Sequence, residues 1–407
     1  MPGIRLKCIA LATLFAAAAA TAQSLPPVKT KIGVLNDQSG IGSSLGGKGS
    51  VIAAQLAIED YQKTHPGSAI ELVTADHQNK SDIGATTARR WYDQDNVQAI
   101  FDVQTSSVAL AVNDLAKQKN KVLIASGAGS ADLTGEKCTP NTVHWTFDTW
   151  ALANATGSAM VKQGGKSWYF ITADYSFGHA LERDTTSVIT ANGGKVIGRV
   201  LHPFAASDFS SYLLQAQASK AEVIGLATSS GDLVSLLKQS AEFGVTQRGQ
   251  RMAALLMFIS DVHALGLKAA QGLMLSSPFY WDLTPETREW SKRFAERHRG
   301  NMPTMVHAGV YSGVLNYLNA LEKLPEEQRS DGVQAVQKMK SLPADDVLFG
   351  KGSIRADGRK LHDMYLFEVK KPAESKGPWD YYKNVATIPA QEAFRPLAQG
   401  GCALVGK

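Results

Sequence analysis

The sequence predicts an α/β fold made of two doubly wound, mainly parallel α/β lobes, and two observations lead to this fold class. Short apolar runs of strand length alternate with helix-type apolar spacing over most of the chain, which is typical of a parallel sheet covered by helices. The alternation begins again at about Phe147, so a second unit of similar design follows the first. With 407 residues, 44% of them hydrophobic, the chain is long enough for two cores and too long for one ordinary domain.

The first unit begins with a strand, a long polar loop and a helix. Residues 32–35 are an apolar run, residues 36–49 are rich in Gly, Ser, Asn, Asp and Gln, and apolar residues from Val51 to Tyr61 recur at helical spacing. Loops at the carboxyl ends of parallel strands bind small molecules in open α/β sheets, so we expect this loop to form one wall of a ligand site. Further strands are predicted at 69–75, 97–103 and 121–125, and helices at 85–92 and 108–117.

The second unit repeats the pattern without a close sequence repeat. Its predicted strands cover residues 168–172, 194–201, 222–227, 253–259 and 272–276, and its predicted helices cover 181–191, 209–218 and 233–243. Long helices are then predicted at 285–299 and 307–324, a shorter one at 333–340, and a β pair at 352–358 and 362–369. Residues 370–407 are rich in proline and charge and give no periodic pattern.

The first 22 residues are typical of a secretory signal. Arg5 and Lys7 precede an apolar run at 9–20, and small residues at 20–22 form a cleavage site. No later run of 18 apolar residues occurs, so we expect an exported, soluble, periplasmic protein. Cleavage lowers the formal net charge from +5 to +3, which is not the charge of a nucleic-acid-binding surface.

Two cysteines, Cys138 and Cys402, remain after the signal, because Cys8 lies within it. In an oxidising compartment an even pair favours a disulfide, which would tie the C-terminal tail to a mid-chain loop. Two unpaired thiols remain the alternative, since geometry cannot be read from sequence.

The loop after the first strand also carries two motif near-matches. Residues 42–49 have the spacing of a phosphate-binding loop, but Gly49 stands where that motif needs a hydroxyl for Mg²⁺. Residues 42–46 fit G-x-S-x-G, so a secreted serine hydrolase using Ser44 is the alternative function. Ser44 lies nine residues beyond Leu35, however, whereas a nucleophile elbow follows its strand directly. The nine histidines show no metal-binding spacing, and we predict no cofactor, metal or catalytic residue.

Several motifs in this order resemble the substrate-binding proteins of ABC importers of the branched-chain amino-acid (Leu/Ile/Val-binding) type. They are KIGVL at 31–35 with the loop that follows, VQTSSVALA at 103–111, IASGAGSADLT at 124–134, DYSFG at 174–178 and SDFSS at 207–211. The resemblance implies a type I periplasmic binding fold, with two lobes joined by a three-strand hinge and a ligand in the cleft between them. It implies lobe 1 at 28–147 plus about 280–352, lobe 2 at 148–279 plus about 353–385, and a tail at 386–407.

The same resemblance implies the residues that contact the ligand. On lobe 1 they are Asp37, Gln38, Ser39, Thr105, Ser106, Ser107, Gly127, Ala128, Gly129 and Ser130, and on lobe 2 they are Tyr175, Phe177, Ser229, Ser230 and Asp261. Hydroxyl and N–H donors at helix starts suit a carboxylate.

Two departures from the family pattern bear on the ligand. Ser229 and Ser230 occupy a loop where amino-acid binders often have a Tyr, and Ser260 falls where they often have a Glu, so that Asp261 stands in for that acid with an offset of one residue. Rings are frequent nearby, at Trp150, Tyr175 and Phe177 and at the crossover residues 279–281. The ligand is therefore either an aliphatic amino acid or an aromatic acid. The expected partner is a membrane permease, and we expect a monomer.

Overall fold

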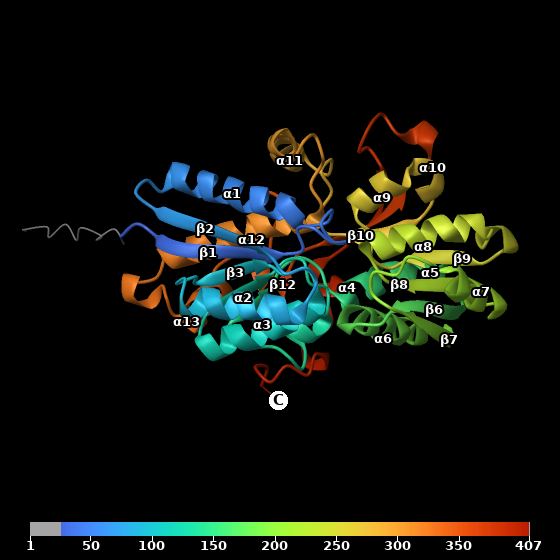
Figure 1. The fold of residues 1–407 in the computed structure, drawn as a ribbon, viewed down its shortest axis with the longest axis horizontal. Coiled ribbons are helices and arrows are strands. Elements are labelled where there is room, and N and C mark those ends of the chain that lie inside the picture. The colour runs from blue at the N-terminus through green and yellow to red at the C-terminus, as the bar shows by residue number, and fades with distance from the viewer. Residues whose placement is uncertain (1–25, 407) are drawn as a thin grey trace, which may run out of the picture.

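The computed structural model describes residues 26–406, so the predicted signal segment and Cys8 lie outside the described residues. The chain forms two α/β lobes that lie end to end along the long axis of the molecule (Figure 1). No helix among residues 26–406 combines the length and the apolar character needed to cross a membrane.

Lobe 1 is built on a five-stranded parallel sheet with strand order β2-β1-β3-β4-β5. Every residue of β3, β4 and β5 is buried, as expected for parallel strands that are covered on both faces. The strands are β1 (Lys29–Asn36), β2 (Ala69–Asp76), β3 (Ala99–Asp102), β4 (Val122–Ala125) and β5 (Thr142–His144).

Helices cover both faces of this sheet. Phe101 of β3 packs in one apolar cluster with residues of α1 and α12, whereas its neighbour Ile100 packs in another with residues of α2 and α3. In Figure 1 these two helix pairs lie on opposite sides of the sheet. The helices of lobe 1 are α1 (Gly47–Thr64), α2 (Ser81–Asp93), α3 (Ser106–Lys119), α11 (Pro285–Arg297), α12 (Met305–Glu322) and α13 (Gly332–Ser341).

Helix α12 is the most buried of these helices, and its sequence explains why. Thr304 caps its first turn by accepting a hydrogen bond from the N–H of Val306 at 3.2 Å. Gly309 lets the helix approach the segment after β5, because a Cβ there would lie 2.1 Å from Oγ1 of Thr146. The predicted helices at 285–299 and 307–324 correspond to α11 and α12.

Lobe 2 has a four-stranded parallel sheet of order β7-β6-β8-β9 and a three-stranded antiparallel sheet of order β10-β13-β14. Its strands are β6 (Ser167–Ala173), β7 (Lys195–His202), β8 (Val223–Ala227), β9 (Arg251–Ala254), β10 (Met274–Ser277), β13 (Met364–Val369) and β14 (Tyr382–Ile388). Its helices are α4 (Thr149–Leu152), α5 (Ser158–Lys162), α6 (Ser176–Ala191), α7 (Ser210–Ala218), α8 (Ser230–Glu242), α9 (Ile259–Leu265) and α10 (Leu267–Ala270).

Three segments connect the lobes and form the hinge: one follows β5, one joins β10 to α11, and one leads into β13. The last segment follows a short hairpin of β11 (Ser353–Ile354) and β12 (Lys360–Leu361), which packs on α13. Arg359, next to β12, also forms a parallel bridge with His144 of β5. The predicted boundary at about residue 353 lies before this hairpin, and the chain joins the lobe 2 sheet at β13.

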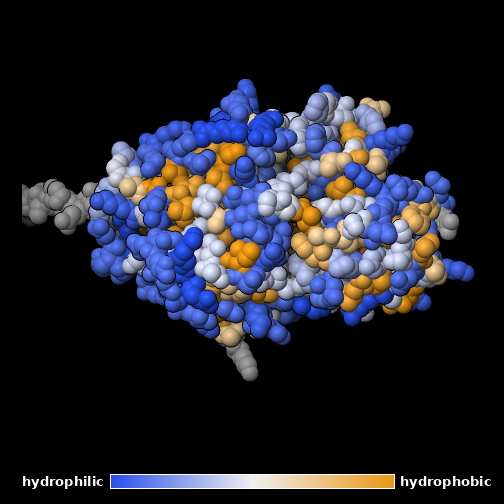
Figure 2. Space-filling model, in the orientation of Figure 1, coloured by the Kyte–Doolittle hydropathy of each residue, from blue (hydrophilic) through white to orange (hydrophobic). Residues whose placement is uncertain are grey.

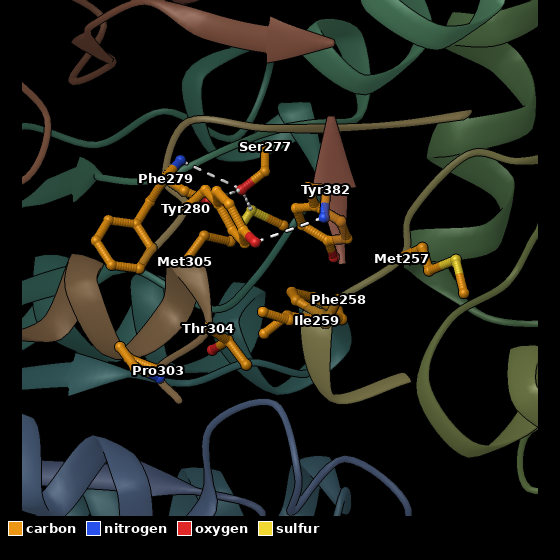
Figure 3. A pocket seen from close by; sticks show the side chains of 10 residues that line it. All are labelled: Met257, Phe258, Ile259, Ser277, Phe279, Tyr280, Pro303, Thr304, Met305 and Tyr382. Carbon is orange, nitrogen blue, oxygen red and sulfur yellow. Dashed lines mark hydrogen bonds between the residues drawn. The ribbon is translucent and has the colours of Figure 1, made fainter. Parts of the chain in front are cut away.

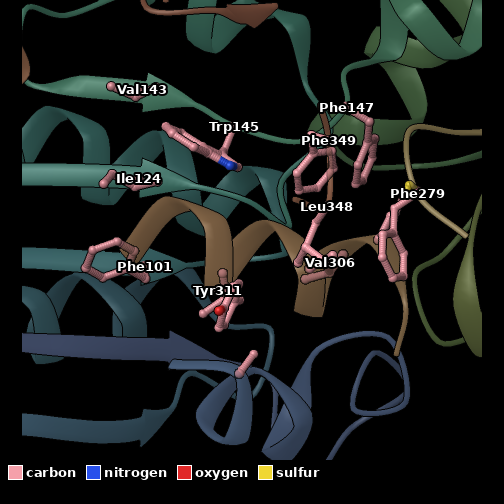
Figure 4. Close-up of a cluster of buried hydrophobic side chains, with 14 of the residues drawn as sticks. Phe101, Ile124, Val143, Trp145, Phe147, Phe279, Val306, Tyr311, Leu348 and Phe349 are labelled. Carbon is pink, nitrogen blue, oxygen red and sulfur yellow. The ribbon is translucent and has the colours of Figure 1, made fainter. Parts of the chain in front are cut away.

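One apolar cluster continues from lobe 1 through the hinge into lobe 2. Figure 4 shows this cluster running from Phe101 and Ile124 of lobe 1 past Trp145 to Phe349, Phe147 and Phe279 at the hinge. The face shown in Figure 2 is mainly hydrophilic, with hydrophobic residues in separate groups on both lobes.

The structure joins Cys138 and Cys402 in a disulfide with a Cα–Cα distance of 5.6 Å, which confirms the predicted bridge.

Candidate ligand-binding site

Loops at the carboxyl ends of the two parallel sheets meet between the lobes. In lobe 1 they follow β1, β3 and β4, and in lobe 2 they follow β6 and β8. A Cβ built on Gly231 of lobe 2 would lie 3.2 Å from Cβ of Ile41 in lobe 1. A Cβ built on Gly129 of lobe 1 would lie 2.7 Å from the ring of Phe177 in lobe 2. The lobes are therefore closed onto each other, and two glycines permit this contact.

Asp37 shapes the loop after β1. Its buried carboxylate accepts hydrogen bonds from the N–H groups of Gly40 at 2.7 Å and Gly42 at 2.9 Å, and from the side-chain amide of Asn79 at 2.5 Å. The side chain of Gln104 accepts a hydrogen bond from the N–H of Asp37 at 3.0 Å and donates one to the carbonyl of Gly42 at 3.2 Å. Asp37 thus holds its own loop in the form that meets lobe 2.

Asn79 joins this loop to the start of α3. Its Oδ1 accepts a hydrogen bond from the hydroxyl of Thr105 at 2.5 Å, while its Nδ2 donates to Asp37. Its φ of 57° is left-handed, a conformation that Asn adopts more often than most residues. One residue after Thr105, the hydroxyl of Ser106 accepts a hydrogen bond from the N–H of Ser130 at 3.2 Å. The loops after β1, β3 and β4 are therefore linked by side-chain hydrogen bonds.

Aromatic side chains at the start of α6 form the lobe 2 side of the candidate site. Phe177 is buried, and its ring centroid lies 6.0 Å from that of Tyr175, which in turn lies 5.1 Å from that of Phe204. Burial raises the pKa of the Tyr175 hydroxyl, and the nearby hydroxyl of Ser229 opposes the shift. Tyr175 thus lies beside the loop after β8.

These residues follow one another in a circuit around the junction of the lobes, partly through contacts and partly as near neighbours in the sequence, and we name them the interlobe ring. Its members, in order, are Asp37, Asn79, Thr105, Ser106, Ser130, Gly129, Phe177, Tyr175, Ser229, Gly231 and Ile41. Most of them were predicted as site residues. The circuit brings together residues that are far apart in the sequence and belong to both lobes.

Three predicted residues of lobe 1 lie outside the ring. Ser39 is exposed, and its hydroxyl donates a hydrogen bond to Asp76 at 2.5 Å. Gln38 donates from its side-chain amide to the hydroxyl of Thr74 at 3.4 Å. Ser107, in the first turn of α3, is half-buried.

The loop after β4 holds two more predicted residues. The N–H of Gly127 donates a hydrogen bond to the carbonyl of Asp102 at 3.3 Å, and the carbonyl of Ala128 forms one with the ring of His144 at 2.7 Å. Asp102 is fully buried beside Gly127, and burial raises the pKa of its carboxyl to about 6.

Two buried acids of lobe 2, Asp261 and Asp232, accept hydrogen bonds from the backbone of their own lobe. Asp261 accepts a hydrogen bond from the N–H of Phe258 at 2.9 Å, and burial raises the pKa of its carboxyl to about 7. Asp232 accepts one from the N–H of Ala205 at 3.0 Å, and burial raises its pKa to about 6. Ser230, buried with a φ of 56°, lies at the start of α8.

A small cavity of about 10 Å³ lies at the hinge beside these residues. It is lined by Met257, Phe258, Ile259, Ser277, Phe279, Tyr280, Pro303, Thr304, Met305 and Tyr382. Figure 3 shows that these side chains come from both lobes and from the crossover, and that Tyr280 accepts a hydrogen bond from the N–H of Tyr382. The Tyr382 hydroxyl is buried and has no hydrogen-bond partner within residues 26–406.

Sequence reasoning missed Asn79, Ile41 and Phe204. Asn79 follows the edge strand β2, and polar residues directly after a strand were the available signal. Ile41 and Phe204 are apolar residues in loops, and only the closed arrangement of the lobes explains their position.

Ser44, the alternative nucleophile, is exposed in the loop before α1. Within residues 26–406 its hydroxyl makes no hydrogen bond with a histidine, which a serine nucleophile needs as its base.

Comparison with known proteins decides which family this fold and site represent. A family model described as a periplasmic binding protein matches residues 29–377. This chain belongs to the periplasmic binding protein family. A periplasmic binding protein from Burkholderia mallei is 49% identical, with a TM-score of 0.89 over 92% of this chain and 99% of that one.

Two further structures show the range of this periplasmic binding protein's relatives. A branched-chain amino acid ABC transporter periplasmic ligand-binding protein from Burkholderia xenovorans LB400 is 37% identical, with a TM-score of 0.80 over 92% of this chain and 99% of that one. A solute-binding protein of an ABC transporter from R. palustris, in complex with benzoate, is 19% identical, with a TM-score of 0.78 over 89% of this chain and 97% of that one. The last likeness shows the shared fold. The B. xenovorans and R. palustris structures are both named as binding proteins of ABC transporters.

Proposed function

We propose that this periplasmic binding protein captures a small carboxylate between its lobes and delivers it to the membrane permease of an ABC importer. The observation that carries the proposal is the set of helix starts at the interlobe ring. Helices α3, α6 and α8 begin beside Thr105, Tyr175 and Ser229, and none of these three N-terminal residues caps its helix with a side-chain hydrogen bond. Free N–H groups and the positive ends of three helix dipoles favour an anion.

The part of the ligand away from its carboxylate meets a different environment. The carboxyls of Asp232 and Asp261 already accept backbone hydrogen bonds, and burial raises the pKa of both. Rings of Tyr175, Phe177 and Phe204 surround the same side.

We therefore favour an aromatic carboxylic acid over an amino acid as the ligand, because the lobe 2 side offers rings and its two acids are already bonded to the backbone of their own lobe. The R. palustris relative in complex with benzoate is consistent with this preference, whereas the B. xenovorans relative is named for branched-chain amino acids. The proposed binding mode is hinge closure, since contacts such as Phe177 against Gly129 require both lobes. A ligand that contacts both lobes binds the closed state more tightly and shifts the population towards it.

A thermal-shift screen tests this function. Purified mature protein is heated with benzoate, 4-hydroxybenzoate, leucine, isoleucine or valine, and each hit is titrated by calorimetry. A ligand at 100 times its Kd stabilises the folded state by about 2.7 kcal/mol and so raises Tm. We expect an aromatic acid to give the largest shift.

Variants locate the site of the best ligand. Ser106→Ala removes a hydroxyl of the ring and Tyr175→Ala removes one of its walls, so each is expected to weaken binding roughly tenfold or more, at about 1.4 kcal/mol for each factor of ten. Ser187→Ala and Tyr212→Ala are matched controls, because Ser187 is exposed on α6 and Tyr212 lies on α7. Unchanged affinity in both ring variants would refute the proposed site.

A further inference from the structure

The C-terminal segment after β14 leaves lobe 2 and ends on lobe 1. It begins at Pro389, contains the short helix α14 (Ala390–Ala393) and a 3-10 turn at Leu397–Gln399, and reaches Cys402. Figure 1 shows the C-terminus below α3, close to the junction of the lobes. Because Cys402 is bonded to Cys138 of lobe 1, residues 389–402 form a fourth covalent path between the lobes. We name this segment the strap.

The first half of the strap is fixed to lobe 2. The carbonyl of Glu392 accepts a hydrogen bond from the side-chain amide of Asn154 at 2.7 Å. The guanidinium of Arg395 pairs with the carboxylate of Asp184 at 3.1 Å and lies over the ring of Trp150, 5.1 Å from its centroid. Asp184 and Trp150 belong to α6 and α4.

The same half also contacts the third hinge segment and the β11–β12 hairpin before it. The N–H of Ala390 donates a hydrogen bond to Asp363 at 2.9 Å. Phe394 is buried, with the guanidinium of Arg359 4.6 Å from its ring centroid. The carbonyl of Arg395 accepts a hydrogen bond from Arg355 at 2.7 Å. The strap is thus packed against the chain that bends when the lobes move.

The second half of the strap is fixed to lobe 1. Besides the disulfide, its backbone packs closely on the loop around Gly135, where a Cβ would lie 2.9 Å from the carbonyl oxygen of Gly400. A second interlobe contact lies beside it, because Arg183 of lobe 2 pairs with Asp132 of lobe 1 at 3.0 Å and also with Asp184. Asp184 therefore connects the strap to an ion pair that spans the lobes.

We propose that the strap restrains the relative movement of the lobes, and that the Cys138–Cys402 disulfide sets how far the ligand-free protein opens. With the bond formed, the strap is anchored on both lobes, and opening has to break its contacts with the hinge. With the bond reduced, the end of the strap is free to leave lobe 1, and the lobes separate further. Opening of the binding protein is in this way coupled to the redox state of its compartment.

Small-angle X-ray scattering of the ligand-free mature protein tests the proposal, so the result does not depend on which ligand the site takes. A compact chain of this length has a radius of gyration of roughly 21 Å, and separation of the lobes increases it. We expect a larger radius in Cys138→Ser/Cys402→Ser and in the wild type after reduction by dithiothreitol, and a return to the starting value after re-oxidation. Equal radii of folded wild type before and after reduction would overturn the proposal.

A second variant keeps the test decisive if loss of the bond unfolds the chain. Arg395→Ala leaves the disulfide intact and removes the anchor on Asp184, so it should also increase the radius. Arg199→Ala is the matched control, because Arg199 pairs with Glu182 at 3.1 Å inside lobe 2. A chain that ends at Cys402 should keep the wild-type radius. If reduction unfolds the protein, an unchanged radius of gyration in Arg395→Ala would overturn the proposal.

Discussion

The ion pair between Lys360 and Asp346 is buried beside the hinge and allows a quantitative test of the packing there. Lys360 is fully buried, and its Nζ lies 2.8 Å from Oδ2 of Asp346. The same ammonium lies 4.5 Å from the ring centroids of both Trp145 and Phe349. Ser312 donates a hydrogen bond to Asp346 at 2.7 Å. Lys360→Met keeps most of the side-chain volume and removes the charge.

We expect Lys360→Met to destabilise the protein strongly. Removing one partner of a buried pair costs about 3–5 kcal/mol, because the other charge stays buried without compensation. With an unfolding entropy of roughly 0.8 kcal/mol/K for about 380 residues, a loss of 4 kcal/mol lowers Tm by roughly 5 °C. The double variant Lys360→Met/Asp346→Asn should recover much of this loss, because it removes the unpaired charge as well.

The pKa of Asp346 predicts how the stability lost in Lys360→Met depends on pH. In the wild type, burial opposes the charge of Asp346, but the ammonium of Lys360 outweighs it and holds the pKa of Asp346 below its usual value. This stabilisation is present above the unfolded pKa and is lost as pH falls through the lower folded pKa. In Lys360→Met the buried carboxyl should have a raised pKa and be destabilising above it. The difference in stability between the two proteins should therefore shrink from pH 7 to pH 4.

The measurement is thermal and urea unfolding followed by circular dichroism across this pH range. Asp346→Asn alone completes a double-mutant cycle that isolates the interaction between the two side chains. A loss below 1 kcal/mol in Lys360→Met that is also independent of pH would refute the reasoning, because the ion pair would then contribute little to the folded state.

Three further predictions concern the site. Asn79→Ala should weaken binding of the best ligand about tenfold, as judged by calorimetry, because it removes the hydrogen bonds to Asp37 and Thr105, and each bond is worth about 1 kcal/mol. Asn192→Ala, directly after α6, is the control, and equal affinity of Asn79→Ala and wild type would contradict this role. The raised pKa of Asp261, about 7, means that stability conferred by its protonated form is present below about pH 4 and lost as pH rises towards 7. Asp261→Asn should reduce this dependence of stability on pH in unfolding experiments, and an unchanged pH dependence would contradict the prediction. Ser44→Ala should leave the ligand-induced Tm shift unchanged, and wild type should not react with a serine-directed phosphonate; labelling at Ser44 would revive the hydrolase alternative.

The fold class and most of the ring could be predicted because their signals are local. Apolar runs such as residues 32–35 mark a buried parallel strand wherever they occur, and Ser and Gly residues directly after a strand mark the edge where ligands bind. The loop after β4 carries this signal and supplies Ser130, whereas Thr105 and Tyr175 were placed by the family motifs at 103–111 and 174–178. The pairing of Cys138 with Cys402 was accessible because only two cysteines follow the signal.

The parts that could not be predicted depend on contacts distant in sequence. Asn79 takes its role from two loops that only folding brings next to it, and no period in the sequence marks such a residue. The strand β14 and the strap lie in a segment of mixed polar and proline residues, where five of the seven residues of β14 are exposed. An exposed edge strand lacks the apolar alternation by which strands are recognised.

The antiparallel pairing of β10 with β13 has a consequence for how the chain is made. Met274 faces Glu368 in this ladder, so the partner of β10 is synthesised almost a hundred residues later. Until residues 364–388 have left the ribosome, β10 presents an unpaired edge, the kind of edge that pairs with other chains. A nascent or truncated chain that ends before β13 therefore leaves this edge open to pairing with other chains.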